Sequence, residues 1–235
     1  MNPAFSYTIF PLGDSALTID FGNTIDLEIN KYVLGLFHHF KGKNNAGIID
    51  IIPSYSSLTF YYNVGAIRQT AIGKTAFEIM KQAIGQELYK VPETETKQQR
   101  EIHIPVCYSS SFAPDLAFIA SEKNIATENI IQIHTSRLYT VHMIGFLPGF
   151  PYMGEVDDAI AIPRKKQPRA KVPQGAVGIA GKQTGIYPLE SPGGWQIIGR
   201  TPLKLFDKEK SDAVLLEPGD NVQFYPITED EFENY

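Results

Sequence analysis

The sequence predicts a small α+β domain followed by a mostly β domain that closes into a barrel. Strand-like and helix-like segments alternate up to residue 92, whereas residues 145–202 hold ten of the 19 glycines and eight of the 16 prolines. At that density these residues mark turns between many short strands, because both weaken strand interiors. Residues 92–100, between the two regions, carry no large apolar side chain. We therefore divide the chain into a domain at 1–92, a linker at 93–100 and a domain at 101–235.

In the first domain, the sequence predicts an antiparallel sheet covered by two helices. The predicted strands are residues 15–21, 47–53 and 57–63. Residues 26–40 place their apolar side chains on one helical face, and residues 73–85 form a second helix that ends at Gly85. The sequence AIGKT at 71–75 ends like a phosphate-binding P-loop, but Arg68 stands where that loop needs its leading glycine. We therefore interpret it as an ordinary helix start.

The second domain begins with regular elements before the glycine-rich region. These elements are a strand at 101–108, helices at 114–124 and 127–136, and a strand at 138–144. Pro114 suits the first turn of the first helix, and Thr127 suits the N-cap of the second. Short strands separated by turns follow, as expected for a barrel that is closed or nearly closed.

Composition excludes several classes of protein. The 235-residue chain has a net charge of -5, which argues against a nucleic-acid binder. Cys107 is the single cysteine, so an internal disulfide and a cysteine-based zinc cluster are excluded. The five histidines form no metal-binding helix signature, and we predict no metal site. No signal peptide and no apolar run of about 18 residues is present, so we expect a cytoplasmic protein.

Candidate binding residues gather in the barrel region. Residues 163–173 concentrate cations, among them Arg164, Arg169 and Lys171, in an otherwise acidic chain. This segment is either a solvated loop or an anion site that its prolines preorganise. Three aromatic residues among glycines and prolines are expected to line a pocket or a partner surface, and they are Phe146, Phe150 and Tyr152.

The stretch ESPGGWQIIGR supplies Glu190, Trp195 and Arg200. Its glycines, Gly193 and Gly194, can adopt positive φ and let the backbone approach a ligand. Residues 191–194 are predicted to form a tight turn at the barrel rim that places Trp195 and Arg200 beside one pocket. The alternative is that Trp195 is a core residue and Arg200 a surface ion-pair partner.

Four segments closely resemble the KipI / allophanate-hydrolase-subunit-1 family. They are GFLPGFPYMG at 145–154, PRKKQPRAKVPQGAVGIAG at 163–181, QTGIYPLESPGGWQIIGRTPLKLFD at 183–207 and EPGDNVQF at 217–224. The resemblance implies a small α/β N-terminal domain and a cyclophilin-like β-barrel domain. One segment departs from the family pattern, because Ser109, Ser110 and Ala113 replace glycines. That replacement bears on any positive φ or close backbone approach there.

The resemblance leaves three functions open. The first is a component of an ATP-dependent 5-oxoprolinase, which opens the 5-oxoproline lactam to glutamate. Its implied partners are a KipA / allophanate-hydrolase-subunit-2 type protein, the C subunit of 5-oxoprolinase, and a third protein, the A subunit. The second is a non-enzymatic inhibitor of a sporulation-type histidine kinase. The third, a component of allophanate hydrolase, ranks last because the sequence shows no amidase nucleophile signature.

The first function assigns provisional roles by residue type. ATP is the implied cofactor, bound in this chain or with a partner protein, because the sequence holds no recognisable nucleotide loop. Phosphorylation of the lactam oxygen would require cations, for which the candidates are Arg164, Arg169, Lys171 and Arg200. Gln183 and the amides around Gly193 and Gly194 are the candidate donors to developing negative charge. The sequence identifies no catalytic residue, and it predicts that the isolated chain is inactive.

Overall fold

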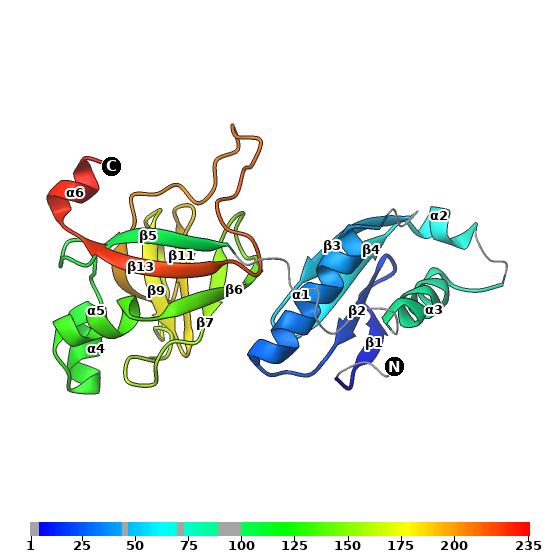
Figure 1. Ribbon diagram of the computed structural model, residues 1–235, viewed down its shortest axis with the longest axis horizontal. Helices are drawn as coiled ribbons and strands as arrows, with labels where there is room; N and C mark the ends of the chain where they lie inside the picture. The colour runs from blue at the N-terminus through cyan, green and yellow to red at the C-terminus, as the bar shows by residue number, and fades with distance from the viewer. Residues whose placement is uncertain (1–4, 44–46, 70–72, 89–99) are drawn as a thin grey trace. The chain divides into compact units, whose positions relative to one another are not determined.

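The computed structural model describes residues 5–43, 47–69, 73–88 and 100–235. The chain divides into two compact units, Met1–Gln98 and Gln99–Tyr235 (Figure 1). The predicted linker lies outside the described residues except for Arg100. None of the described helices is long and apolar enough to cross a membrane.

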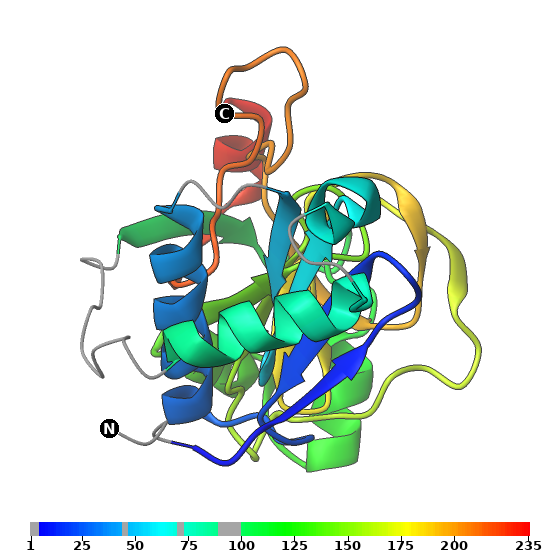
Figure 2. The same cartoon turned by 90° about the vertical axis from the view of Figure 1, so that its right-hand side faces the viewer.

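The N-terminal unit is a four-stranded antiparallel sheet with its helices on one face. Its strands run in the order β1 (Thr8–Pro11), β2 (Ala16–Asp20), β4 (Ser57–Tyr62) and β3 (Ile48–Pro53). The helices are α1 (Leu27–Lys41), the short α2 (Val64–Arg68) and α3 (Ala76–Leu88). Figure 1 shows α1 in front of β3 and β4, and Figure 2 shows α3 in front of the strands. Side chains of both long helices pack with Leu17 and Phe60 of the sheet in one apolar core. The predicted α+β arrangement is confirmed.

The second long helix differs from the prediction at both ends. It begins at Ala76 because Thr75 and Glu78 bond reciprocally: the Glu78 carboxylate accepts from the Thr75 amide (2.8 Å), and the Thr75 hydroxyl accepts from the Glu78 amide (3.2 Å). This pair is a capping box. The helix also continues through Gly85, because burial of Leu88 outweighs the cost of a helical glycine, about 1 kcal/mol.

Seven strands of the C-terminal unit form a closed barrel, as expected. Its order is β10 (Gln183–Ile186), β7 (Pro151–Gly154), β6 (Leu138–Ile144), β13 (Asn221–Ile227), β5 (Glu101–Cys107), β12 (Gln196–Arg200) and β9 (Ala176–Ala180), which pairs back to β10. Strands β5 and β13 are parallel, and the other neighbours are antiparallel. Apolar side chains from every strand fill the interior, so the barrel is a packed core.

The remaining elements lie around the barrel. They are a two-stranded sheet of β8 (Arg169–Val172) and β11 (Ser191–Gly193), and helices α4 (Leu116–Lys123), α5 (Thr127–Thr135) and α6 (Glu229–Glu233). The predictions for the first residues of two helices need correction, the start of α4 and the N-cap of α5. Helix α4 begins two residues after Pro114, and the N-cap of α5 is Ala126, whose backbone is extended, so Thr127 is the first helical residue.

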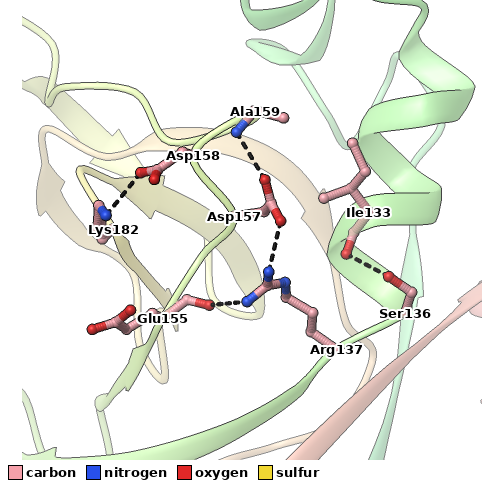
Figure 3. A network of polar contacts seen from close by, with 8 residues as sticks. All are labelled: Ile133, Ser136, Arg137, Glu155, Asp157, Asp158, Ala159 and Lys182. Atoms are coloured by element: carbon pink, nitrogen blue, oxygen red, sulfur yellow. Dashed lines mark hydrogen bonds and ion pairs between the residues drawn. The ribbon is translucent and has the colours of Figure 1, made fainter. Parts of the chain in front are cut away.

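A network of charged side chains fixes the loop that leaves β7 and leads to β8 (Figure 3). The Arg137 guanidinium donates to the Asp157 carboxylate (2.6 Å) and to the Glu155 carbonyl (3.5 Å). Asp157 also accepts from the Ala159 amide (2.9 Å), which closes the turn. The loop continues into residues 163–173, the basic segment, and its start is therefore held to the barrel.

One polar network is buried in the barrel core. The two ring nitrogens of His134 bond to the Tyr108 hydroxyl (2.9 Å) and to the Thr184 hydroxyl (3.0 Å). Burial lowers the pKa of His134 to about 3 from its ordinary 6.5, so the ring is neutral at neutral pH. Its partners satisfy both nitrogens, which makes it a structural histidine.

Candidate functional site

An aromatic pocket of about 300 Å³ opens on the C-terminal unit. It is lined by residues of the loop after β6, of the basic segment at 163–173, and of β11 and the residues that follow β11, together with Tyr152 and Tyr187. The residues are Phe146, Phe150, Tyr152, Arg164, Pro168, Tyr187, Pro192, Gly193, Gly194 and Trp195. The structure thus brings seven of the predicted site residues together: the three aromatic residues, Arg164, both glycines and Trp195.

Three buried rings form the wall of this pocket. The Phe150 ring meets the Trp195 ring edge to face at 5.4 Å between centroids, and it meets the Tyr187 ring in the same way at 5.1 Å. Trp195 is only 4% exposed. Trp195 is therefore both a packed residue and a wall of the pocket, which joins the two alternatives that the sequence left open for it. Edge-to-face contacts of this kind fix ring orientations.

The loop at 145–150 holds Phe146 in a strained conformation at the rim. Phe146 has φ of 67°, which is uncommon for a residue other than glycine, and its side chain is 63% exposed. Its ring packs edge to face on Phe150 at 5.7 Å. Gly149 also has positive φ, and a Cβ there would lie 3.2 Å from the Leu205 carbonyl oxygen. Strain and exposure together at one aromatic residue are typical of a binding site.

The role predicted for Gly193 and Gly194 requires correction. Neither glycine has positive φ, and residues 191–193 are not a tight turn but strand β11. A Cβ on Gly193 would lie 2.3 Å from the Tyr187 hydroxyl, whereas one on Gly194 would meet nothing closer than 3.7 Å. The Tyr187 hydroxyl in turn bonds to the Trp195 backbone. Gly193 therefore makes room for Tyr187, and this contact positions the aromatic wall.

Arg164 supplies the positive charge of the pocket. Its guanidinium carbon lies 5.9 Å from the centroid of the Trp195 ring. No ion pair joins Arg164 to any residue that the structure describes. Burial raises the pKa of Tyr152 and Tyr187, and Arg164 opposes that rise in both. The guanidinium therefore acts on three aromatic side chains of the pocket.

Arg169 is held by a buried carboxylate that the sequence did not single out. Asp115 is 3% exposed, and it accepts from Arg169 (2.6 Å) and Lys165 (3.0 Å) through one oxygen and from the Ile197 amide (2.6 Å) through the other. Burial by itself would raise the pKa of Asp115, but the bonds from these donors outweigh burial and lower it. Asp115 stands directly before helix α4, a position typical of capping aspartates, so the sequence offered no signal of this role.

Four other predicted residues lie outside the pocket. Lys171 pairs with Glu190 at 3.1 Å, and both side chains are largely exposed. Gln183 begins β10 opposite Gly154, and Arg200 ends β12 with its Nε donating to the Gln174 carbonyl (2.8 Å). Arg200 also lies over the Phe112 and Phe232 rings, at 5.9 and 5.7 Å.

The prediction that Trp195 and Arg200 flank one pocket is therefore wrong. Five residues of extended chain separate them, a distance of about 16 Å. Arg200 makes no surface ion pair with any described residue either, since its contacts are the carbonyl and the two rings. The alternative prediction, that Arg200 is a surface ion-pair partner, is thus also wrong, and Arg200 packs on two aromatic rings instead.

The positions where serine and alanine replace the family glycines are accommodated without strain. Ser109, Ser110 and Ala113 all have negative φ. The Ser109 and Ser111 hydroxyls bond to each other at 2.9 Å, and Ser111 donates to the Glu229 carboxylate. Hydrogen bonds from Ser109 and Ser111 lower the pKa of Glu229.

In the described part of the chain, no group of three or more His, Cys, Asp and Glu side chains is placed to hold a metal ion.

Comparison with known proteins identifies the family. The model of the carboxyltransferase domain, subdomain C and D, matches residues 7–216. The 5-oxoprolinase B subunit of Bacillus subtilis (strain 168) is 40% identical over 231 residues, which are 97% of this chain and 96% of that protein. The 5-oxoprolinase B subunit of Escherichia coli O157:H7 is 34% identical over 218 residues, covering 93% and 95%. The crystal structure of TTHA0988 superposes with a TM-score of 0.78 at 32% identity, over 90% of this chain and 40% of that one. The chain belongs to the carboxyltransferase subdomain C and D family, together with the 5-oxoprolinase B subunits.

Proposed function

We propose that this chain is the B subunit of an ATP-dependent 5-oxoprolinase complex, which opens 5-oxo-L-proline to L-glutamate. The observation that carries the proposal is the match to the 5-oxoprolinase B subunit of Bacillus subtilis along 97% of the chain. A match over nearly the whole length of both proteins supports the same role for both units of the chain. The pocket described above supports a ligand-binding role within that complex.

The distribution of cations supports an ATP site in a partner protein. Binding a triphosphate requires several cations that converge on it. Lys165 and Arg169 both pair with Asp115, and Lys171 is paired with Glu190. Of the described cations in the basic segment, Arg164 alone lines the pocket, and one guanidinium suits one carboxylate. This chain then supplies the surroundings of the lactam, and a partner supplies the nucleotide.

We further propose that the chain works with a KipA-type protein, the 5-oxoprolinase C subunit, and with the 5-oxoprolinase A subunit. The match to TTHA0988 spans 40% of that chain, so a relative carries this fold as part of a longer polypeptide. Because that relative joins this fold to further polypeptide, it supports assembly of this chain with separate proteins. The isolated chain is then catalytically silent.

The experiment is reconstitution with the cognate partners. The chain is purified alone and after co-expression with the A and C subunits, and ATP hydrolysis is measured with and without 5-oxo-L-proline. We expect substrate-dependent hydrolysis and stoichiometric glutamate from the complex, and none when this chain is omitted. Turnover by the single chain would refute the proposal that the isolated chain is inactive and that a partner supplies the nucleotide site. A complex without activity, together with inhibition of histidine-kinase autophosphorylation by the chain, would establish the regulatory alternative.

A further inference from the structure

The aromatic pocket has the size and shape of a site for a small flat ligand. Its volume of about 300 Å³ is at the lower end for small-molecule sites, which favours a ligand smaller than a nucleotide. Trp195 and Phe150 line the pocket from mutually fixed positions, and with 4% and 1% of their surface exposed they offer a ligand only a small apolar contact. Because these rings are already ordered, a ligand that contacts them costs the protein little side-chain entropy.

The polar groups of the pocket define what such a ligand carries. Arg164 is a cation without an ion-pair partner among the described residues, and its forked donor suits a carboxylate. Burial raises the pKa of Tyr187, so the phenol stays protonated at neutral pH. Its oxygen bonds to the Trp195 backbone, and its proton is available to a carbonyl oxygen. The pocket therefore offers one charge, one neutral donor and an apolar wall.

We infer that this pocket is the binding subsite for a five-membered lactam carboxylate, with the carboxylate on Arg164, the ring against Trp195 and the lactam oxygen near Tyr187. The inference rests on the proposed function for the identity of the ligand, 5-oxo-L-proline. The strained Phe146 lines the same pocket and is its most exposed aromatic residue. Arg164 is then a substrate-binding residue, and the negative charge of the ligand determines its orientation.

Trp195 provides a direct assay, because it is the only tryptophan of the chain. The full chain is titrated with 5-oxo-L-proline while tryptophan fluorescence is recorded. We expect a saturable change that 2-pyrrolidinone, the same lactam without a carboxylate, does not produce. Arg164→Gln is expected to weaken binding at least tenfold, and Arg164→Lys to restore part of it. Lys182→Gln removes one charge from the same unit near Asp158 and serves as the matched control.

The reconstituted complex separates this inference from the proposed function. With Arg164→Gln we expect KM for 5-oxoproline to rise at least tenfold, with KM for ATP unchanged and an unaltered melting temperature. An active wild-type complex in which Arg164→Gln leaves KM for 5-oxoproline within twofold would overturn the subsite and leave the function intact. A rise confined to KM for ATP would overturn it as well, because the pocket would then hold phosphate. A complex without oxoprolinase activity would instead refute the function.

Discussion

Replacing Asp115 by alanine tests how the basic segment is held against the barrel. The change removes the acceptor of three donors: Arg169 (2.6 Å), Lys165 (3.0 Å) and the Ile197 amide (2.6 Å). The carboxylate side chain is 4% exposed, and those of Arg169 and Lys165 are 26% and 30% exposed. The variant thus leaves a partly buried guanidinium and a buried amide without their partner.

The magnitude follows from these contacts. Removing one member of a buried ion pair costs about 3–5 kcal/mol, and a buried amide left unpaired costs about 1–3 kcal/mol. The two losses overlap at one side chain, so we expect the free energy of unfolding to fall by about 3–5 kcal/mol in total. The matched control is Glu190→Ala, which breaks the exposed pair with Lys171 and is expected to cost less than about 1 kcal/mol.

Urea denaturation followed by Trp195 fluorescence measures the effect, because Trp195 reports on the C-terminal unit alone. The sign of the pH dependence is also fixed. The pKa of Asp115 is lowered below its ordinary 3.8, so its contribution is complete above pH 3.8 and is lost as the pH falls through the depressed pKa. The difference between wild type and Asp115→Asn should therefore shrink only below pH 3.8. A loss under about 1 kcal/mol in Asp115→Ala would refute the anchoring role.

Other parts of the chain give three further predictions. Gly193→Ala should lower the free energy of unfolding by about 1–3 kcal/mol, because its Cβ would lie 2.3 Å from the Tyr187 hydroxyl. The control Gly194→Ala should change the free energy of unfolding by less than about 1 kcal/mol, and equal effects of the two variants would contradict the steric argument. Limited proteolysis should cut between Pro92 and Arg100 and leave two folded fragments, and early cleavage within 145–206 would place the boundary elsewhere. His134, buried with its pKa lowered to about 3, should make the unfolded state take up one more proton below pH 6.5. Stability then falls by about 1.4 kcal/mol per pH unit from 6.5 toward 3, and His134→Gln should lose that slope in pH-dependent urea titrations.

Much of the fold was predictable because it depends on local pattern. Alternation in residues 57–63 and the single apolar face of residues 26–40 specify a strand and a helix without knowledge of the rest of the chain. The density of glycine and proline in residues 145–202 likewise indicated short strands in a closed or nearly closed barrel, and the strand pairing closes it. The errors at Gly85 and Thr127 arose where packing or a neighbouring residue set the helix end. The grouping of Phe146, Phe150 and Tyr152 was also predictable, since all three lie close together in the chain, in one loop and the start of the next strand.

By itself the sequence determined the two kinds of domain, the cluster of aromatic residues at 146–152 and the concentration of cations at 163–173. Only the tertiary structure decided which cation faces the pocket, because ion-pair partners are chosen by distance in space. Asp115 is 54 residues from Arg169 in sequence, yet it pairs with that side chain, whereas Arg164 lines the pocket. Arg200 is five residues from Trp195 but lies beyond reach, since an extended strand carries it about 16 Å along the barrel. Spacing along the chain fixes periodicity, whereas strand direction and burial fix which charges meet.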